Sequence, residues 1–516
     1  MMPLSRRALL LSPWAGESAA VRHILPAASH DRFRLKVSFP LRHLPPPVLR
    51  VGATRVTGER ADSLGENWVF NADRLKPATS YELQLYDASR KSLFGPWPLR
   101  TLPHPDEPVS RFRLMVYTCA GGHDGMRLPE DNGKPYWVSL ANRRRLIAAG
   151  LEQKPDALLS IGDQIYWDLR FGRASGRAPM GSSEWAHRAV GEFRRDLSAR
   201  DNEAVLKRAA GPQIADLYGT MLCSIPTFFV QDDHDYYEND EAIPPGREPH
   251  GVSLPPDDFM LQLARSTQAL YFPEFLPDAT RPAGLSGSGE SYGTIRFGRA
   301  AELLVYDCRR YLSLTGSYAG FISSGAEAWL VERMKSSNAS HVVNVPSTPI
   351  GWSAGKWGEW YPDLLDDDGS LSTAKPKYMW QDGWKRQHDR LLRASSAMTR
   401  GVPLFLSGDL HALAHGAIDH NGKDDLRRNP VHSVLTGPIS TGPRGWPSAA
   451  RGTPPRVATG IGIKETLAPL EMNGFTLVDF LPDRVECSMY RWKMDRPESE
   501  LDLMQPFHRF VLPRMI

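Results

Sequence analysis

The sequence has little cysteine and no long apolar run. Four of its 516 residues are cysteines, Cys119, Cys223, Cys308 and Cys487, and no two of them form a C-x-x-C pair. This spacing indicates neither a disulfide framework nor a zinc ribbon, and it predicts reduced, buried thiols. No apolar run approaches the roughly 18 residues that a membrane-spanning helix needs. We therefore expect no transmembrane segment.

The chain also lacks an excess of charge of either sign. It has 62 basic and 59 acidic residues, which gives a formal net charge of +3. This balance provides no reason to expect a nucleic-acid-binding or membrane-binding surface. The charged and hydrophobic fractions, 23% and 41%, are ordinary for a globular protein. We find no internal repeat and no low-complexity tract.

Two adjacent arginines near the N-terminus resemble part of a twin-arginine export signal. Residues 5–11 read SRRALLL, but Ser12 and Pro13 follow at once, whereas an export signal needs an apolar stretch of about 7–15 residues. We therefore expect residues 8–11 to form a first strand. This pattern favours a cytoplasmic protein, with export as the alternative.

Residues 1–106 are predicted to form a small all-β domain. Strand-like runs at 33–39, 48–51 and 81–86 are separated by turns that contain Pro and Gly. Short strands at this spacing suggest a sandwich. Residues 75–83 resemble the L-x-P-x-T-x-Y corner of fibronectin type III domains, in which Tyr81 would hydrogen-bond back to the turn. Residues 103–108 are predicted to be a linker, and a second domain is expected over 107–516.

In the second domain, strand-like and helical patterns alternate, which is typical of an α/β architecture. A helix is expected over 139–151 and a closing hairpin over 475–490. Buried strands are expected at 114–117, 157–161, 227–230, 303–306, 341–345 and 404–406. Several of these strands are followed directly by a polar or ionisable residue, and this edge of an α/β sheet is where sites assemble. Segments 244–256, 284–293 and 351–373 are expected to be long surface excursions, either lids or substrate walls.

Three strand ends carry the candidate chemistry. Gly162 permits a tight turn after which the Asp163 carboxylate would project and could bridge two cations; an Asx-turn on the surface is the alternative. The segment 232–235 places three carboxylates around His234, and these would repel each other unless a cation offset the charge; a solvated acidic loop is the alternative. Asp409 and His411, two residues apart in extended chain, would point to the same side and could serve neighbouring metals.

Taken in order, these three motifs resemble the calcineurin-like metallophosphoesterases, and in particular the PhoD-like (alkaline phosphatase D) branch. The branch pattern G-D-x-x-Y, D-D-H-[ED], G-D-x-H matches Asp163 with Tyr166, residues 232–235, and Asp409 with His411. The branch also has an N-terminal β-sandwich, so the resemblance covers nearly the whole chain. It implies an α/β metallophosphoesterase sandwich of mixed β-sheets flanked by helices, preceded by an immunoglobulin- or fibronectin-like sandwich.

The resemblance also implies a first metal site with an unusual ligand. The generic D-x-H motif is missing after the first strand, and Cys119 stands where PhoD-like proteins have a cysteine ligand. Asp163 would bridge two metals, while Cys119, Tyr166 and His411 would complete the first site. Thiolate, phenolate and imidazole together favour iron there.

A second metal site would use oxygen ligands from Asp233 and Asp409, and these suit calcium or another divalent ion. The wider superfamily has a histidine after the strand at 341–345, and this chain has none, so Asn344 or Ser347 would have to substitute. Asn239 is a further candidate oxygen ligand. The second metal is therefore expected to be weaker, different in identity or partly held by water.

His234 is expected to face the substrate, where it would stabilise the phosphoryl group or protonate the leaving alkoxide. Arg309, in a D-x-R segment, would bind a phosphate oxygen, or else form a structural ion pair with Asp307 or another acid. His415 and His420 are expected to be ordinary polar positions. Trp352, Trp357 and Trp360 would either stack on a substrate group or pack within a surface loop. The roles of His234 and Arg309 toward the substrate follow from the resemblance.

The predicted function is hydrolysis of a small-molecule or lipid phosphate ester, of the alkaline phosphatase or phosphodiesterase type, by a metal-bound hydroxide at a two-metal site. One alternative is a catalytically silent scaffold or adhesion protein with a vestigial phosphoesterase domain, suggested by the altered motifs. Another is a metal-dependent hydrolase of a non-phosphate ester, which would differ only in its substrate walls.

Overall fold

The computed structural model describes residues 20–124, 127–128, 134–167, 191, 193–194, 196–198, 200–237, 255–281, 291–313, 318–354, 380, 382–450 and 452–514. The strand expected at 8–11, the twin-arginine segment, Asn239, Trp357 and Trp360 lie outside these residues, as do most of the three predicted excursions. Among the described residues, no helix has the length and apolar character to cross a bilayer. All four cysteines are free and buried.

The N-terminal region is all-β, as expected, and consists of two four-stranded sheets. One sheet has the order β1 (His23–Ala28), β2 (Phe33–Ser38), β6 (Asn67–Ala72) and β5 (Glu59–Arg60); the other has the order β4 (Thr54–Thr57), β3 (Val48–Val51), β7 (Ser80–Tyr86) and β8 (Ser92–Arg100). Leu35, Trp68, Leu83 and Trp97 are buried in its core. The Tyr81 hydroxyl accepts the N–H of Lys76 at 2.8 Å, which is the predicted corner bond.

The remainder of the chain contains two mixed sheets. The six-stranded sheet has the order β13 (Thr227–Val230), β12 (Ala157–Ile161), β9 (Phe112–Thr118), β24 (Asn473–Leu481), β25 (Arg484–Trp492) and β26 (His508–Pro513). Strand β12 runs parallel to β9 and β13, whereas β24 and β25 form the predicted antiparallel closing hairpin. Every residue of β12 and β13 is buried, which explains their largely apolar sequence.

The eight-stranded sheet holds the other predicted strands. Its order is β14 (Tyr292–Phe297), β15 (Ala301–Tyr306), β16 (His341–Pro346), β18 (Leu404–Ser407), β21 (Val431–Thr436), β19 (Leu413–Asn421) and β20 (Asp424–Asp425), with β23 (Ile461–Leu470) paired to β19. Strands β15, β16, β18 and β21 are parallel neighbours. Val116, Leu159, Val305 and Leu404 belong to one buried cluster, so the two sheets share a core between them.

Helices cover the outer faces of this sandwich. Helices α1 (Leu140–Leu151), α3 (Glu203–Tyr218) and α4 (Asp258–Tyr271) pack on the six-stranded sheet, and α5 (Ser324–Ser336) and α6 (Asp382–Ser396) pack on the other. Ser139 caps α1 by accepting the N–H of Asn142, at the start predicted for this helix. Short elements complete the fold: β10 (Arg127–Leu128), β11 (Lys134–Pro135), β17 (Trp352–Ser353), β22 (Arg456–Val457), α7 (Pro447–Ala450) and 3-10 helices at Asp233–Asp235 and Glu498–Leu503. The predicted sandwich of mixed sheets flanked by helices is confirmed.

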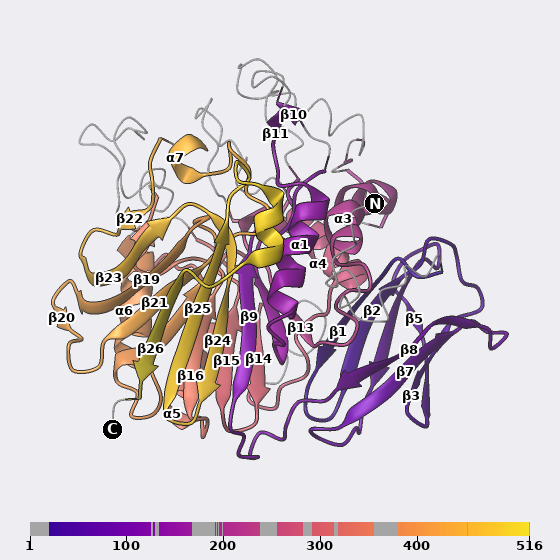
Figure 1. Cartoon of the computed structure of the whole chain (residues 1–516), viewed down its shortest axis with the longest axis horizontal. Helices are drawn as coiled ribbons and strands as arrows, with labels where there is room; N and C mark the ends of the chain where they lie inside the picture. The colour runs from indigo at the N-terminus through magenta and orange to yellow at the C-terminus, as the bar shows by residue number, and fades with distance from the viewer. Residues whose placement is uncertain are drawn as a thin grey trace.

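The all-β region lies beside α3 and α4 (Figure 1). Buried hydrogen bonds join it to the end of α4 and to the segment after α3: His23 Nε2 lies 2.8 Å from the Tyr271 carbonyl oxygen, and Trp97 Nε1 donates to the Cys223 carbonyl at 3.0 Å. Lys36 Nζ lies 2.7 Å from Glu274 Oε1. Strand β8 ends at Arg100 and β9 begins at Phe112, and we propose the domain boundary at residue 106 between them.

Replacing Lys36 with methionine is expected to lower the free energy of unfolding by about 3 kcal/mol, because the partner Glu274 stays buried without its closest cation. The two side chains are only 2% and 6% exposed. The matched control is Arg50→Met, which removes a pair with Glu82 in which the side chains are 28% and 58% exposed, and should cost at most about 1 kcal/mol. Urea unfolding measures both. Equal losses in the two variants would contradict the assignment of a buried interdomain ion pair.

Candidate metal centre

The polar strand ends converge at one edge of the two sheets. A Cβ on Gly408 would lie 2.3 Å from Thr118 Oγ1 and 2.7 Å from the Ile161 carbonyl oxygen, so the turn after β18 packs directly on the ends of β9 and β12. Only glycine leaves room for this approach. Thr118 also forms a parallel bridge with Pro438, just beyond β21. Residues from both sheets therefore meet here.

Several predicted site residues have strained backbones at this edge. Cys119, Asp163, Asp409 and His411 have φ angles of 51°, 55°, 64° and 47°. Left-handed conformations are costly for residues with a Cβ, and they persist where the surrounding structure imposes them, as it does at many functional sites. Sequence patterns carry no signal for this strain.

Four side chains predicted for the first metal site lie together. Cys119 Sγ lies 3.3 Å from Asp163 Oδ2, and the Tyr166 hydroxyl lies 3.0 Å from the same oxygen and 3.2 Å from His411 Nε2. His411 Nδ1 is 2.6 Å from the Gly445 carbonyl oxygen. Because a carbonyl can only accept, Nδ1 carries the proton, and Nε2 presents its lone pair to the cluster.

Asp163 also belongs to the neighbouring group. Its carboxylate lies with donor atoms of Asp233 and His234 in one set within 4.8 Å of one another, and Asp232, Asp233 and Asp409 form a further set of the same compactness. Asp163 therefore belongs to two of these compact sets, and its bridging of two metals stays a prediction.

Burial and mutual repulsion destabilise the charged forms of these acids. Asp163 is 1% exposed, and Asp232 and Asp233 are fully buried. Burial, together with repulsion from Asp233 and the other carboxylates, raises the pKa of Asp163 well above its ordinary value. Burial likewise raises the pKa of Asp232. A bound metal would offset both effects, and thiolate, phenolate, imidazole and carboxylate donors fit a transition metal in the first group.

Asp235, the third acid of the segment, serves the backbone. Its carboxylate accepts the N–H groups of Asp163, Gln164 and Asp232, each at 2.9 Å. It thereby joins the turn after β12 to the turn after β13. Burial raises its pKa to about 8 despite these hydrogen bonds. Sequence reasoning had not separated this acid from its neighbours.

The Arg309 guanidinium contacts the acids of the candidate centre. Its Nε donates to Asp232 Oδ1 at 2.7 Å, and Ser347 Oγ donates to the same oxygen at 2.9 Å. The Arg309 backbone N–H donates to Asp307 Oδ1 at 2.7 Å. These contacts favour the ion-pair alternative with an acid other than Asp307, while binding of a phosphate oxygen stays a prediction. Asn344 faces Met334 of α5, with Nδ2 3.4 Å from Sδ.

The rings of Trp137 and His234 lie beside Tyr166 of the first group. The Tyr166 ring centroid lies 4.3 Å from that of Trp137 and 4.4 Å from that of His234. His234 is partly exposed, and its backbone N–H donates to Asp163 Oδ1 at 3.3 Å.

Three other residues singled out in the sequence hydrogen-bond to side chains outside the candidate centre. His415 hydrogen-bonds Thr466 and lies 3.4 Å from His432, and His420 pairs with Asp419. Both are ordinary polar positions, as expected. Trp352 is fully buried and donates to Glu465 at 2.8 Å, so it packs within the protein.

Gln213 of α3 is a residue that sequence reasoning missed. Its Oε1 accepts the N–H of Gly122 at 2.6 Å and that of Tyr166 at 2.8 Å, and its Nε2 donates to the Tyr166 carbonyl at 2.9 Å. One buried amide thus ties the loop after Cys119 to the loop that carries Tyr166. A glutamine inside an amphipathic helix gives no sequence signal for this contact.

Replacing Gln213 with leucine is expected to destabilise the protein by about 3 kcal/mol, because two buried N–H groups lose their acceptor. It should also weaken metal retention by displacing Tyr166. Gln213→Glu is the control, since a protonated glutamic acid keeps one acceptor and one donor. Thermal unfolding and metal content measure the two effects. A leucine variant with the stability and metal content of the wild type would argue against this role of Gln213.

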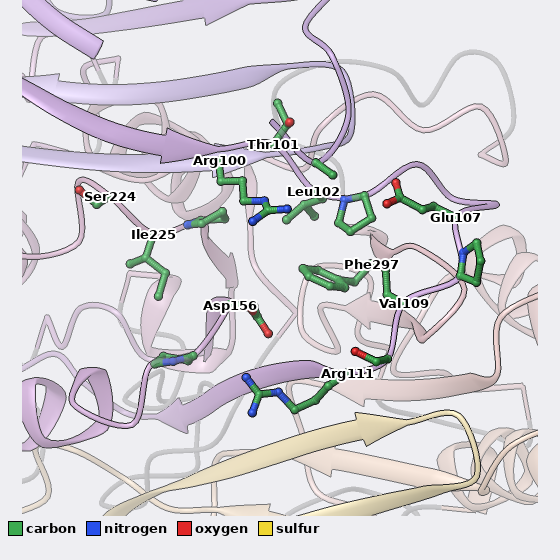
Figure 2. Close-up of a pocket in the computed structure, with 16 residues that line it drawn as sticks. Arg100, Thr101, Leu102, Glu107, Val109, Arg111, Asp156, Ser224, Ile225 and Phe297 are labelled. Carbon is green, nitrogen blue, oxygen red and sulfur yellow. The ribbon is translucent and has the colours of Figure 1, made fainter. Parts of the chain in front are cut away.

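A separate hollow lies at the opposite ends of the strands (Figure 2). It has a volume of about 540 Å³ and includes Arg100, Asp156 and Phe297 in its lining. Asp156 precedes β12, whereas Asp163 follows it. No predicted site residue lines this hollow, so it is distinct from the candidate centre.

Comparisons with known proteins agree with the fold and the motifs. Residues 144–489 match the sequence model of the PhoD-like phosphatases. The fold is similar to that reported as "Structure of PhoD", with a TM-score of 0.61 and 15% identity over 96% of this chain and 90% of that one. It is also similar to the purple acid phosphatase PPD1 from yellow lupin (Lupinus luteus) seeds, with a TM-score of 0.55 and 11% identity over 96% and 74% of the two chains.

No curated protein sequence matches the chain, and identities this low make the two solved structures evidence of fold alone. The family match is different in kind, because it extends over more than half of the chain and includes the segments that hold Asp163, residues 232–235, Asp409 and His411. It confirms the resemblance found in the sequence. The chain belongs to the PhoD-like phosphatase family and is a phosphoric ester hydrolase.

Proposed function

We propose that the chain hydrolyses phosphate esters at a two-metal centre built by Cys119, Asp163, Tyr166, Asp233, Asp409 and His411. The observation that carries the proposal is that the Cys119 thiol, the Tyr166 phenol and the His411 imidazole gather at the Asp163 carboxylate. Family membership supports metal-dependent phosphoester hydrolysis in general. The assignment of individual ligands is our inference from the geometry.

The two groups suit different metals. Cys119, Tyr166 and His411 offer a thiolate, a phenolate and an imidazole, a set that favours iron. Asp233 and Asp409 offer only carboxylate oxygens, which favour calcium or another divalent ion. Asp163, which belongs to compact groups on both sides, would hold the two cations at a fixed separation.

The bound metals would lower the pKa of water and polarise the phosphoryl group. The chain's own side chains would do the rest. Asp163 would align the two cations, and Asp235 would hold the Asp163 turn in place. His234, partly exposed beside the Asp163 carboxylate, would donate a proton to the leaving oxygen or a hydrogen bond to the phosphoryl group.

The substrate we propose is a small-molecule or lipid phosphate ester. The test is hydrolysis of p-nitrophenyl phosphate and of bis(p-nitrophenyl) phosphate by the purified protein, before and after a chelator and after metal is restored. We expect turnover that disappears with the metals and returns with them. Full metal occupancy without turnover on either ester would support a silent scaffold instead.

A further inference from the structure

We propose that Arg309 sets the affinity of the second metal position and keeps the ion there exchangeable. Its guanidinium would compete with a divalent ion for the Asp233 and Asp409 carboxylates. The proposal rests on the proposed function, because it assigns a role beside the same site. It goes further by predicting that one buried side chain makes the two metal positions unequal.

The geometry places the guanidinium among the acids. Nε pairs with Asp232 Oδ1 at 2.7 Å, while Nη2 lies 3.4 Å from Asp409 Oδ2 and 3.7 Å from Asp233 Oδ1. All three acids belong to one compact group of possible ligands. An ion bound to Asp233 and Asp409 would therefore share both carboxylates with Arg309.

Burial makes this competition strong. The Arg309 side chain is fully buried, and the three acids are at most 7% exposed. Water can screen neither the attraction between guanidinium and carboxylates nor the repulsion between guanidinium and a metal cation. Removing the guanidinium should leave three buried carboxylates whose charge a divalent ion can offset better than before.

Asp232 is the closest carboxylate partner of the guanidinium. Its Oδ1 accepts from both Arg309 Nε and Ser347 Oγ, which fixes the plane of the guanidinium and directs Nη2 at Asp409. Ser347 stands after β16, where the wider superfamily is expected to have a histidine ligand. Here that position supports the arginine.

The adjacent Arg310 provides a matched control. It is also buried, but it pairs with a different set: Nε lies 3.1 Å from the Tyr236 hydroxyl, and Nη2 lies 3.1 Å from Gln231 Oε1. Asp307 is its closest carboxylate, at 3.8 Å. Loss of Arg310 removes a buried positive charge of the same kind without freeing Asp233 or Asp409.

The test is calcium titration by isothermal calorimetry of the full chain with its first metal bound. We expect Arg309→Gln to bind Ca²⁺ at least tenfold more tightly than the wild type, and Arg310→Gln to bind it as the wild type does. Arg309→Lys keeps the buried charge but lacks the planar fork that reaches Asp409, so it should bind Ca²⁺ about threefold more tightly. Arg309→Lys tests the proposal if Arg309→Gln does not fold.

Unchanged or weaker Ca²⁺ binding in the folded Arg309 variants would overturn the proposal and would show that Arg309 organises the ligands. Equal tightening in Arg310→Gln would overturn it too. The content of tightly held transition metal, measured by elemental mass spectrometry in each variant, separates this failure from a failure of the proposed function. A wild type that holds no such metal and hydrolyses no ester contradicts the function itself.

Discussion

Replacing Asp163 with asparagine is expected to lower kcat on the order of 10³-fold or more and to release metal from both positions. Asp163 is the side chain that both groups of candidate ligands share, and its Oδ2 lies within 3.3 Å of Cys119 Sγ and 3.0 Å of the Tyr166 hydroxyl. An amide of the same shape removes the charge that attracts two cations. The effect should therefore be electrostatic and should leave the fold in place.

Asp156→Asn is the control for this variant. Asp156 precedes β12 as Asp163 follows it, and its Oδ2 accepts the N–H of Arg113 at 2.8 Å, far from the candidate ligands along the strand. We expect wild-type metal content and kcat in the control. Elemental mass spectrometry and initial rates on p-nitrophenyl phosphate measure both variants. Retention of both metals and of full activity in Asp163→Asn would refute the bridging role.

Replacing His234 with glutamine is expected to lower kcat by about 10²–10⁴-fold while the tightly held metal stays in place. His234 is partly exposed, and its ring lies tilted beside that of Tyr166, with centroids 4.4 Å apart. If His234 protonates the leaving oxygen, the loss should be large for an alkyl phosphate and much smaller for p-nitrophenyl phosphate, whose leaving group needs little protonation. If it stabilises the phosphoryl group, both esters should slow equally.

His420→Gln is the control for general effects of removing a histidine, because the His420 side chain is 47% exposed and pairs with Asp419. The rates on the two esters, with metal content measured on the same samples, separate the two roles. An unchanged kcat on both esters in His234→Gln, with the metals bound, would exclude His234 from the reaction.

The strands, and the meeting of their polar ends at one edge, could be predicted because their signals are local. Strands such as β12 and β13 are buried on both faces, so they appear in the sequence as largely apolar runs, followed by Gly162-Asp163 and by Gln231-Asp232. Parallel strands bring such ends to one edge of the sheet. Cys119 and Tyr166 needed the family resemblance, because neither residue type marks a metal site by itself.

The supporting residues could not be predicted because tertiary contacts define their roles. Gln213 meets Gly122 and Tyr166 across more than 40 residues of chain, and Asp235 meets the turn at Asp163 across more than 70. Arg309 left two roles open, and only the position of Asp232 beside it favours one. The left-handed backbones of Cys119, Asp163, Asp409 and His411 likewise depend on packing between turns of different strands.

The most direct test of the account is the transition-metal content of the wild type and of the Cys119→Ser, Tyr166→Phe double variant, measured by elemental mass spectrometry after gel filtration. These substitutions remove the two ligands that distinguish the first position from an ordinary acidic and histidine site. The account predicts about one tightly held transition-metal ion per wild-type chain and almost none in the double variant, with iron as the expected element. A wild type without a transition metal, or a double variant with the same content, would contradict it.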